Sequence, residues 1–235
     1  TANAVTGSVG SLKLVDQHGN TVVSSKTLKI QDEGGNVVAD GEYGLGLAVK
    51  NQKLGLAYQL NTVRVHDGKI LTLKGTAPAS ASDDNNTLSA VLTGQGGLKV
   101  SEGAITLANN QNGYTGMTEV LNGATLNAGS DNAFGPTSGL VNNGTVNSNG
   151  FKQTIYGSVD NVGTLNIAGG SWTVNKDLNQ TGTLAVTAGA NLSVKGNAVM
   201  ASTSTVNGSV LTVAETATVT GTTQLENATV NFGNG

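Results

Sequence analysis

Cysteine is absent from the 235-residue chain, proline occurs only twice, and aromatic residues make up 3% of the sequence. Without cysteine there is neither a disulfide framework nor a thiolate metal site. The scarcity of aromatic side chains argues against a thick globular core. Glycine supplies 34 residues, and Asn, Thr, Ser, Ala, Val and Leu provide much of the rest. This mixture favours short strands joined by tight turns over long helices.

Charge is also scarce, since 15 acidic and 12 basic residues give a net charge of −3, with Arg64 as the single arginine. No basic run could follow a phosphate backbone, which argues against nucleic acid as a partner. No apolar run reaches the roughly 18 residues of a membrane-spanning helix, so we expect none in this chain. The chain begins at Thr1 and ends in strand-like sequence, so we expect it to be cut from a longer protein.

An internal repeat of about 19–20 residues runs through the second half of the chain. A unit of this length is too short for a strand, a helix and a return, but it suits three short strands with turns. The repeated segments are Ala124–Asn127, Gly144–Asn147, Gly163–Asn166 and Gly182–Ala185, preceded by Val120–Asn122, Leu140–Asn142, Val159–Asn161 and Leu178–Gln180.

This repeat predicts an all-β fold, a right-handed parallel β-helix (β-solenoid) with about 19–20 residues per coil. Successive coils stack about 4.8 Å apart, so equivalent apolar residues should form columns inside the solenoid. We expect the pattern to slip by about three residues near Thr203. The predicted columns are Leu126, Val146, Leu165 and Leu184, and Val120, Leu140, Val159 and Leu178.

The first hundred residues differ in texture because they hold most of the charges. Residues 12–20 and 28–36 share a pattern of strand, Gly-Asn turn and strand, which predicts hairpins. Residues 63–73, broken by Asp67-Gly68, predict another hairpin or a coil with a tight corner, and residues 76–87 a polar loop. We therefore divide the chain into irregular coils with protruding hairpins (1–87), a glycine-led segment (88–127) and regular coils (128–235).

The glycine-led segment contains strand-like stretches with an aromatic step between them. These are Leu92–Val100, Gly103–Leu107, Asn112–Thr118 with Tyr114-Thr115-Gly116, and Gly123–Leu126. The segment closely resembles the passenger-associated repeat of type V autotransporters, and residues 128–135 resemble the stretch that comes after that repeat in such passengers. Ser101-Glu102 and Met117 depart from the Gly, Ala or Thr that are common there.

The resemblance implies a right-handed β-helix that is exported through the periplasm and displayed on the outer surface of a Gram-negative cell. It also implies a partner in the same precursor, a carboxy-terminal translocator barrel. In the family, the repeat is linked to efficient folding and secretion of long passengers. Self-associating and adhesive passengers are the relatives that it suggests.

We identify no catalytic residue, and we expect neither a metal nor a cofactor. His18 and His66 each adjoin a turn, so both are expected to be solvated. Asp160 and Asp177 are separated by nearly one period of the repeat, and Lys176 adjoins the second of them. A solvated face is the expectation there, and a carbohydrate-active site is the alternative, because some β-helices carry clustered carboxylates.

Two further features have simple interpretations. Asp83-Asp84, in the polar loop, could bind a cation weakly, but no calcium-loop motif accompanies them. Trp172 shares its strand phase with Val174 and is expected to point inward, and Tyr114 is expected to pack within its own repeat.

Polar residues also recur with the repeat. The last residue of Val120–Asn122 and of each of its three repeats carries a side-chain amide. These amides are expected to stack as a ladder that satisfies backbone groups: Asn122, Asn142, Asn161 and Gln180. Alternation places another set on the outer face, where it forms a candidate binding strip: Thr125, Asn127, Thr145, Asn147, Thr164, Asn166 and Thr183.

The leading hypothesis is an adhesin that uses this outer strip for self-association, biofilm formation or attachment to host surfaces. Its partners would be a second copy of the chain or a host surface protein or glycan. The first alternative is a stalk that folds and projects another region. The second is an enzyme that acts on polysaccharides, which the fold alone would permit.

Overall fold

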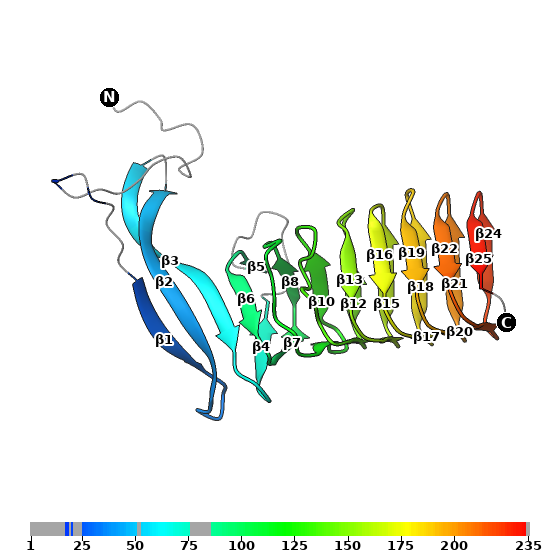
Figure 1. Ribbon diagram of the computed structural model, residues 1–235, viewed down its shortest axis with the longest axis horizontal. Helices are drawn as coiled ribbons and strands as arrows, with labels where there is room; N and C mark the ends of the chain where they lie inside the picture. The colour runs from blue at the N-terminus through cyan, green and yellow to red at the C-terminus, as the bar shows by residue number, and fades with distance from the viewer. Residues whose placement is uncertain (1–16, 19, 21–24, 51–52, 76–85, 234–235) are drawn as a thin grey trace.

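The computed structural model describes residues 17–18, 20, 25–50, 53–75 and 86–233. For residues 46–50 and 53–56 it describes the backbone alone. Within these residues the chain forms 25 β-strands in four sheets, and no helix is long and apolar enough to cross a membrane. Figure 1 shows an elongated molecule in which one coil follows another along the long axis. The prediction of an all-β solenoid is confirmed.

Three parallel sheets form the faces of the solenoid. The first face contains β4 (Ile70–Lys74), β7 (Gly97–Glu102), β9 (Thr118–Val120), β11 (Leu140–Asn142), β14 (Val159–Asn161), β17 (Leu178–Gln180), β20 (Ala198–Met200) and β23 (Ala217–Val219). The second contains β5 (Thr87–Leu88), β8 (Ala104–Leu107), β10 (Thr125–Ala128), β12 (Thr145–Asn147), β15 (Thr164–Ala168), β18 (Thr183–Thr187), β21 (Thr203–Asn207) and β24 (Thr223–Glu226). The third contains β13 (Gln153–Ile155), β16 (Ser171–Val174), β19 (Asn191–Val194), β22 (Val210–Val213) and β25 (Thr229–Phe232).

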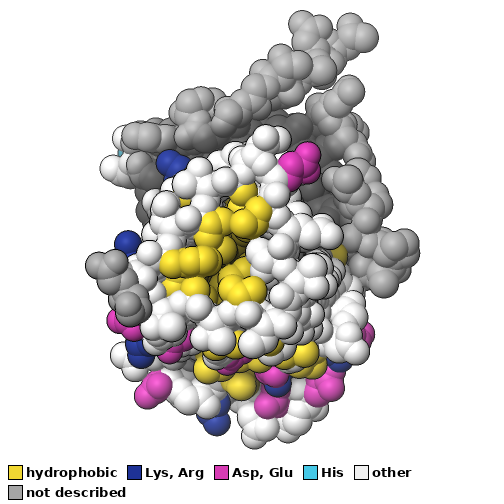
Figure 2. Space-filling view, turned by 90° about the vertical axis from the view of Figure 1, so that its right-hand side faces the viewer, with side chains coloured by type: hydrophobic (Ala, Val, Ile, Leu, Met, Phe, Trp, Pro, Cys, Tyr) yellow, Lys and Arg dark blue, Asp and Glu magenta, His cyan; other side chains and the backbone are white. Residues whose placement is uncertain are grey.

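The inner column of the second face is confirmed. Leu126, Val146, Leu165 and Leu184 pair in that order on adjacent coils, and each is at most 1% exposed. Figure 2, which looks onto the last coil, shows hydrophobic side chains gathered inside a ring of other atoms. The apolar core therefore runs along the axis of the solenoid.

The column predicted for the first face is wrong at its first member. Thr118, rather than Val120, pairs with Leu140, and Val120 pairs with Asn142. The cause is the corner between β9 and β10, which has four linking residues, whereas the corner between β11 and β12 has two. Gly123 gives the longer corner its turn with a φ of 81°.

The slip expected near Thr203 is also wrong. Thr183 pairs with Thr203, and Leu184 pairs with Ser204, so the register continues from β18 to β21 without a break. Ser204 is buried in the inner column, in the position that an apolar residue holds on the preceding coil. Because Ser204 is polar, the apolar pattern of the sequence did not reveal the register at this coil.

A fourth sheet lies at the amino-terminal end of the solenoid. β1 (Ser25–Gln31), β2 (Val37–Lys50) and β3 (Lys53–Val65) are antiparallel, and β6 (Val91–Gly94) joins β3 in parallel. The hairpin predicted for residues 28–36 is confirmed, with Gly35 at a φ of 80°. Residues 12–16 of the other predicted hairpin and residues 76–85 of the polar loop lie outside the described residues.

The Asp67-Gly68 turn is a corner of the solenoid and not a hairpin. β3 and β4 flank the turn but belong to different sheets, since β3 pairs with β6 and β4 with β7. Val38 and Ala39 of β2 join the core cluster of the first coil. The fourth sheet therefore covers the start of the core and passes directly into the first coil.

Candidate functional site

The residues of the predicted outer strip lie together on the second face. Thr125, Thr145, Thr164 and Thr183 are register partners on β10, β12, β15 and β18, and Thr203 continues this threonine column on β21. Asn127, Asn147 and Asn166 form a second column beside it. All are partly or fully exposed, while the residues between them in each strand point into the core.

The asparagine column is bonded to itself. Asn147 Nδ2 donates to Asn127 Oδ1 at 2.8 Å, and Asn166 Nδ2 donates to Asn147 Oδ1 at 2.9 Å. Within the described part of the chain, the threonine hydroxyls of the strip have no hydrogen-bond partner. The strip therefore consists of a pre-ordered row of amides beside a row of hydroxyls that remain available to a ligand or to water.

The inner amide ladder has three of its four predicted members. Asn142 Nδ2 donates to Asn161 Oδ1 at 2.7 Å, and Asn161 Nδ2 donates to Gln180 Oε1 at 2.5 Å. Asn142 and Asn161 also donate to the carbonyls of Thr164 and Thr183 at 2.8 and 2.9 Å. All three amide side chains are buried, so they satisfy polar groups that water cannot reach.

Asn122 does not belong to this ladder. It is exposed in the longer corner after β9, and Val120 lies in register with Asn142 in its place. At the other end of the ladder, Met200 is the register partner of Gln180. Apolar residues thus bound the three amides on both sides, which gives the ladder a definite length.

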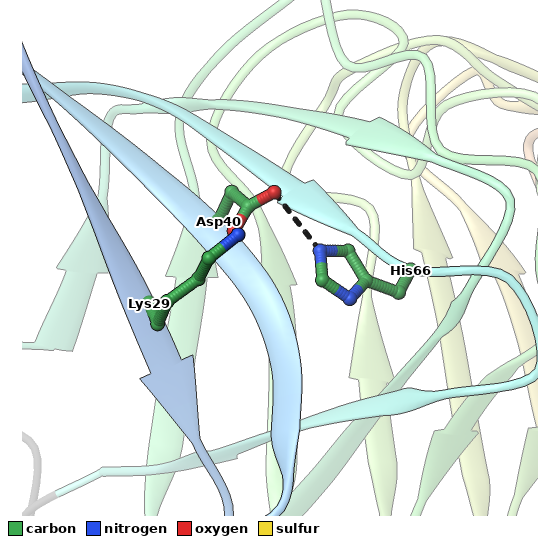
Figure 3. Close-up of polar contacts among 3 residues, drawn as sticks. All are labelled: Lys29, Asp40 and His66. Atoms are coloured by element: carbon green, nitrogen blue, oxygen red, sulfur yellow. Dashed lines mark hydrogen bonds and ion pairs between the residues drawn. The ribbon is translucent and has the colours of Figure 1, made fainter.

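His66 differs from its expected solvated state. It follows β3 at a turn, as predicted, but its side chain is 33% exposed and its Nε2 lies 3.0 Å from Asp40 Oδ2 (Figure 3). Lys29 Nζ donates to the other oxygen of Asp40 at 2.6 Å. These hydrogen bonds, first from Lys29 and then from His66, lower the pKa of Asp40 below its usual value.

This cluster holds the fourth sheet together across β1, β2 and the end of β3. A similar contact ties the β1–β2 turn to the solenoid, where Lys74 Nζ donates to Glu33 Oε1 at 2.5 Å and lies 3.8 Å from Glu102. The bond to Lys74 lowers the pKa of Glu33. His18 is exposed, and its Nε2 lies 3.2 Å from Gln17 Nε2.

The two carboxylates considered for a carbohydrate-active site, Asp160 and Asp177, each accept a hydrogen bond from an asparagine of the following coil. Asp160 Oδ1 accepts a hydrogen bond from Asn179 Nδ2 at 2.7 Å. Asp177 Oδ1 accepts one from the backbone N–H of Asn197 at 2.8 Å. Among the described residues, no three His, Cys, Asp or Glu side chains gather in a way that could hold a metal ion. Asp83-Asp84 lie outside the described residues.

The two aromatic residues of the prediction are buried. Trp172 is 0% exposed and meets Phe134 edge-on, with 5.8 Å between the ring centroids. The Tyr114 hydroxyl lies 2.8 Å from Thr118 Oγ1, which lies 2.9 Å from Thr137 Oγ1. Burial raises the pKa of Tyr114. Tyr114 therefore packs within its own segment, as expected, and Thr118 extends the hydroxyl contacts to Thr137 on the next coil.

No protein-family model and no solved structure matches the chain. The uncharacterized lipoprotein YdeK of Escherichia coli (strain K12) is 38% identical over 160 residues, which cover 66% of this chain and 12% of YdeK. The uncharacterized protein YuaQ of the same strain is 32% identical over 162 residues, which cover 64% of this chain and 11% of YuaQ. The chain thus spans about a tenth of the length of the curated relatives that it matches.

Proposed function

We propose that this chain is part of an autotransporter passenger, displayed on the surface of a Gram-negative bacterium, and that it acts as an adhesin. Three observations support the proposal: the resemblance of residues 92–126 to the passenger-associated repeat, the β-solenoid fold, and a relative named as a lipoprotein. Export would pass through the periplasm and a translocator barrel of the same precursor.

The threonine column carries the adhesive part of the proposal. Its hydroxyls have no internal partner within the described residues, and parallel pairing repeats them at the inter-strand spacing of about 4.8 Å. The neighbouring asparagines are held in place by their own bonds, so little side-chain entropy is lost when a surface docks on them. Each contact is weak, but many displayed copies acting together give a strong attachment.

The partner would be a second copy of the chain on another cell or a protein or glycan of a host surface. We propose a binding rather than a catalytic role because Asp160 and Asp177, the carboxylates considered for an active site, are each held by an asparagine. Catalysis exploits an enclosed site from which water is excluded. A flat strand face lacks such an enclosure and is better suited to docking.

Bacteria that display the full precursor would test the strip. In one variant Thr145→Lys and Thr164→Lys place two like charges on adjacent coils of the second face. The matched control, Thr154→Lys with Thr173→Lys, places the same charges on adjacent coils of the third face. We expect loss of aggregation, or of attachment to host cells, only in the first variant.

Surface display is measured in parallel with an antibody, so that a folding or export defect is recognised. If both variants are displayed normally and both aggregate like the parent, the adhesive strip is contradicted. The solenoid would then serve as a stalk that projects another region. The inner ladder and the continuous core would suit that role equally well.

A further inference from the structure

Two adjoining hollows lie at the corner between the fourth sheet and the first face, away from the outer strip. One, of about 380 Å³, is lined by Arg64, His66 and Gln95 among others. The second, of about 350 Å³, shares Asp67 and Gln95 with the first and reaches Met117. Each is within the size range in which proteins hold small ligands.

Part of the lining of the second hollow is backbone, because the coils stack too closely at its glycines for side chains. A Cβ on Gly96 would lie 2.3 Å from the carbonyl oxygen of His66, and one on Gly116 would lie 2.3 Å from the carbonyl oxygen of Gly96. Glycine is therefore required by the packing. The two hollows together are named the trough. Its glycines Gly96 and Gly116 contribute only backbone to the lining, and the exposed apolar residues Ile70 (48%) and Met117 (52%) line it beside them.

Arg64 provides a free cation at the other end of the trough. It is exposed on β3, and its guanidinium forms no hydrogen bond or ion pair within the described part of the chain. Its register partner Asp40 is already occupied by Lys29 and His66 (Figure 3). An arginine with five unused donors, beside a hollow, matches the geometry of a carboxylate.

The charged groups around the trough favour a ligand that carries carboxylates together with neutral hydroxyl groups. Glu119 at the apolar end is neutralised by Lys99 at 2.9 Å. Asp67, at the junction of the hollows, can accept hydrogen bonds from hydroxyl donors, and Lys69, which also lines the second hollow, adds a second cation. The rings of an acidic sugar offer hydroxyl donors beside each carboxylate, whereas the acidic side chains of a peptide offer carboxylates alone.

We propose that this trough binds a carboxylated sugar of a polysaccharide or glycan. Its carboxylate lies on Arg64, its hydroxyls meet Asp67 and Gln95, and the apolar face of the next ring packs on Ile70 and Met117. The site is separate from the threonine column, so it can succeed or fail independently of the adhesive strip.

Calorimetric titration of the purified protein with a galacturonic acid trimer tests the assignment. We expect binding that weakens at least about tenfold when the trimer is methyl-esterified or when Arg64→Gln removes the guanidinium. Met117→Ala should weaken it several-fold. The control Lys152→Gln, which removes another exposed cation, should leave it unchanged. Thermal unfolding of each variant confirms that the fold is intact.

Several results would overturn the assignment. They are the absence of binding to the folded parent protein, equal affinity for the ester, or equal weakening by Lys152→Gln, which would indicate non-specific charge attraction. Binding of a sulfated trimer without binding of the carboxylated one would also refute the choice of ligand. Aggregation of displaying bacteria is measured with Arg64→Gln as well, and it should not change.

Discussion

Replacing the central member of the inner amide ladder should destabilise the solenoid more than any exposed asparagine does. Asn161 is 0% exposed, accepts a hydrogen bond from Asn142 at 2.7 Å, and donates to Gln180 at 2.5 Å and to the Thr183 carbonyl at 2.9 Å. Each such bond contributes about 1 kcal/mol net, and a buried acceptor left without a donor costs about 1–2 kcal/mol more. Asn161→Ala should therefore lower the free energy of unfolding by about 4 kcal/mol.

Asn147→Ala is the matched control, because Asn147 also accepts from one asparagine and donates to another on adjacent coils. Its side chain is half-buried, so water replaces the lost partners and the expected cost is about 1 kcal/mol. Urea unfolding followed by circular dichroism and by the fluorescence of Trp172, the only tryptophan, measures both costs. Trp172, on β16, lies on the same coil as Asn161, on β14, and reports unfolding there even if the coils do not all unfold together.

A difference between the two variants of less than about 1 kcal/mol would refute the reasoning that burial sets the value of these amide bonds. The pair Asn142→Ala and Asn161→Ala provides a second check. The double variant should cost less than the sum of the single ones because the two residues share a bond. Strict additivity would mean that the 2.7 Å contact contributes nothing to stability.

Three further predictions follow from packing and charge. Trp172→Ala should cost about 3–5 kcal/mol in urea unfolding, because a fully buried indole leaves a cavity; a cost near zero would mean that the core collapses around it. Gly163→Ala should destabilise the protein more than Gly189→Ala does, because a Cβ at Gly163 would lie 2.0 Å from a carbonyl oxygen. At Gly189 a Cβ would meet open space, and the only cost is the backbone strain of a φ of 74°. Equal melting temperatures of the two variants would contradict this prediction. The pKa of Asp40 is lowered in the folded state, so its contribution to stability is present above the unfolded pKa and is lost as the pH falls towards the folded one. The protection factors of the amides in β1 and β2, which correct the exchange rates for their intrinsic pH dependence, should therefore fall on acidification in the parent, and less steeply in Asp40→Asn.

The sequence predicted the solenoid because its inner columns tolerate little besides apolar residues. Leu126, Val146 and Leu165 are register partners on successive coils, so their spacing along the chain is the register of the strands. The prediction failed where a polar residue occupies an inner position, as Thr118 and Ser204 do. Thr118 is satisfied by the hydroxyls of its neighbours, which no periodicity could reveal.

The outer strip could be predicted from the sequence and the trough could not, because only the strip lies where the repeat reveals the register. The outer strip follows from alternation once the register is known, so its residues were identified. The trough depends on Gly96 and Gly116, which stack on backbone of the preceding coil, and on an Asp40 that is occupied by other partners. These relations join residues that are distant in the sequence and lie in the irregular coils and the glycine-led segment, where the repeat of the second half does not mark the register.

The geometry of a solenoid separates stability from recognition more completely than a globular fold does. Each strand gives alternate residues to the core, where Leu184 and its partners are 0 or 1% exposed, and gives the others to solvent. The outer columns can therefore change without cost to the core, provided that no buried bond depends on them. An outer column that keeps one residue type over five coils, as the column from Thr125 to Thr203 does, is not required by packing. The proposed adhesive role would account for this regularity by contacts outside the chain, and this is the reason to test it first.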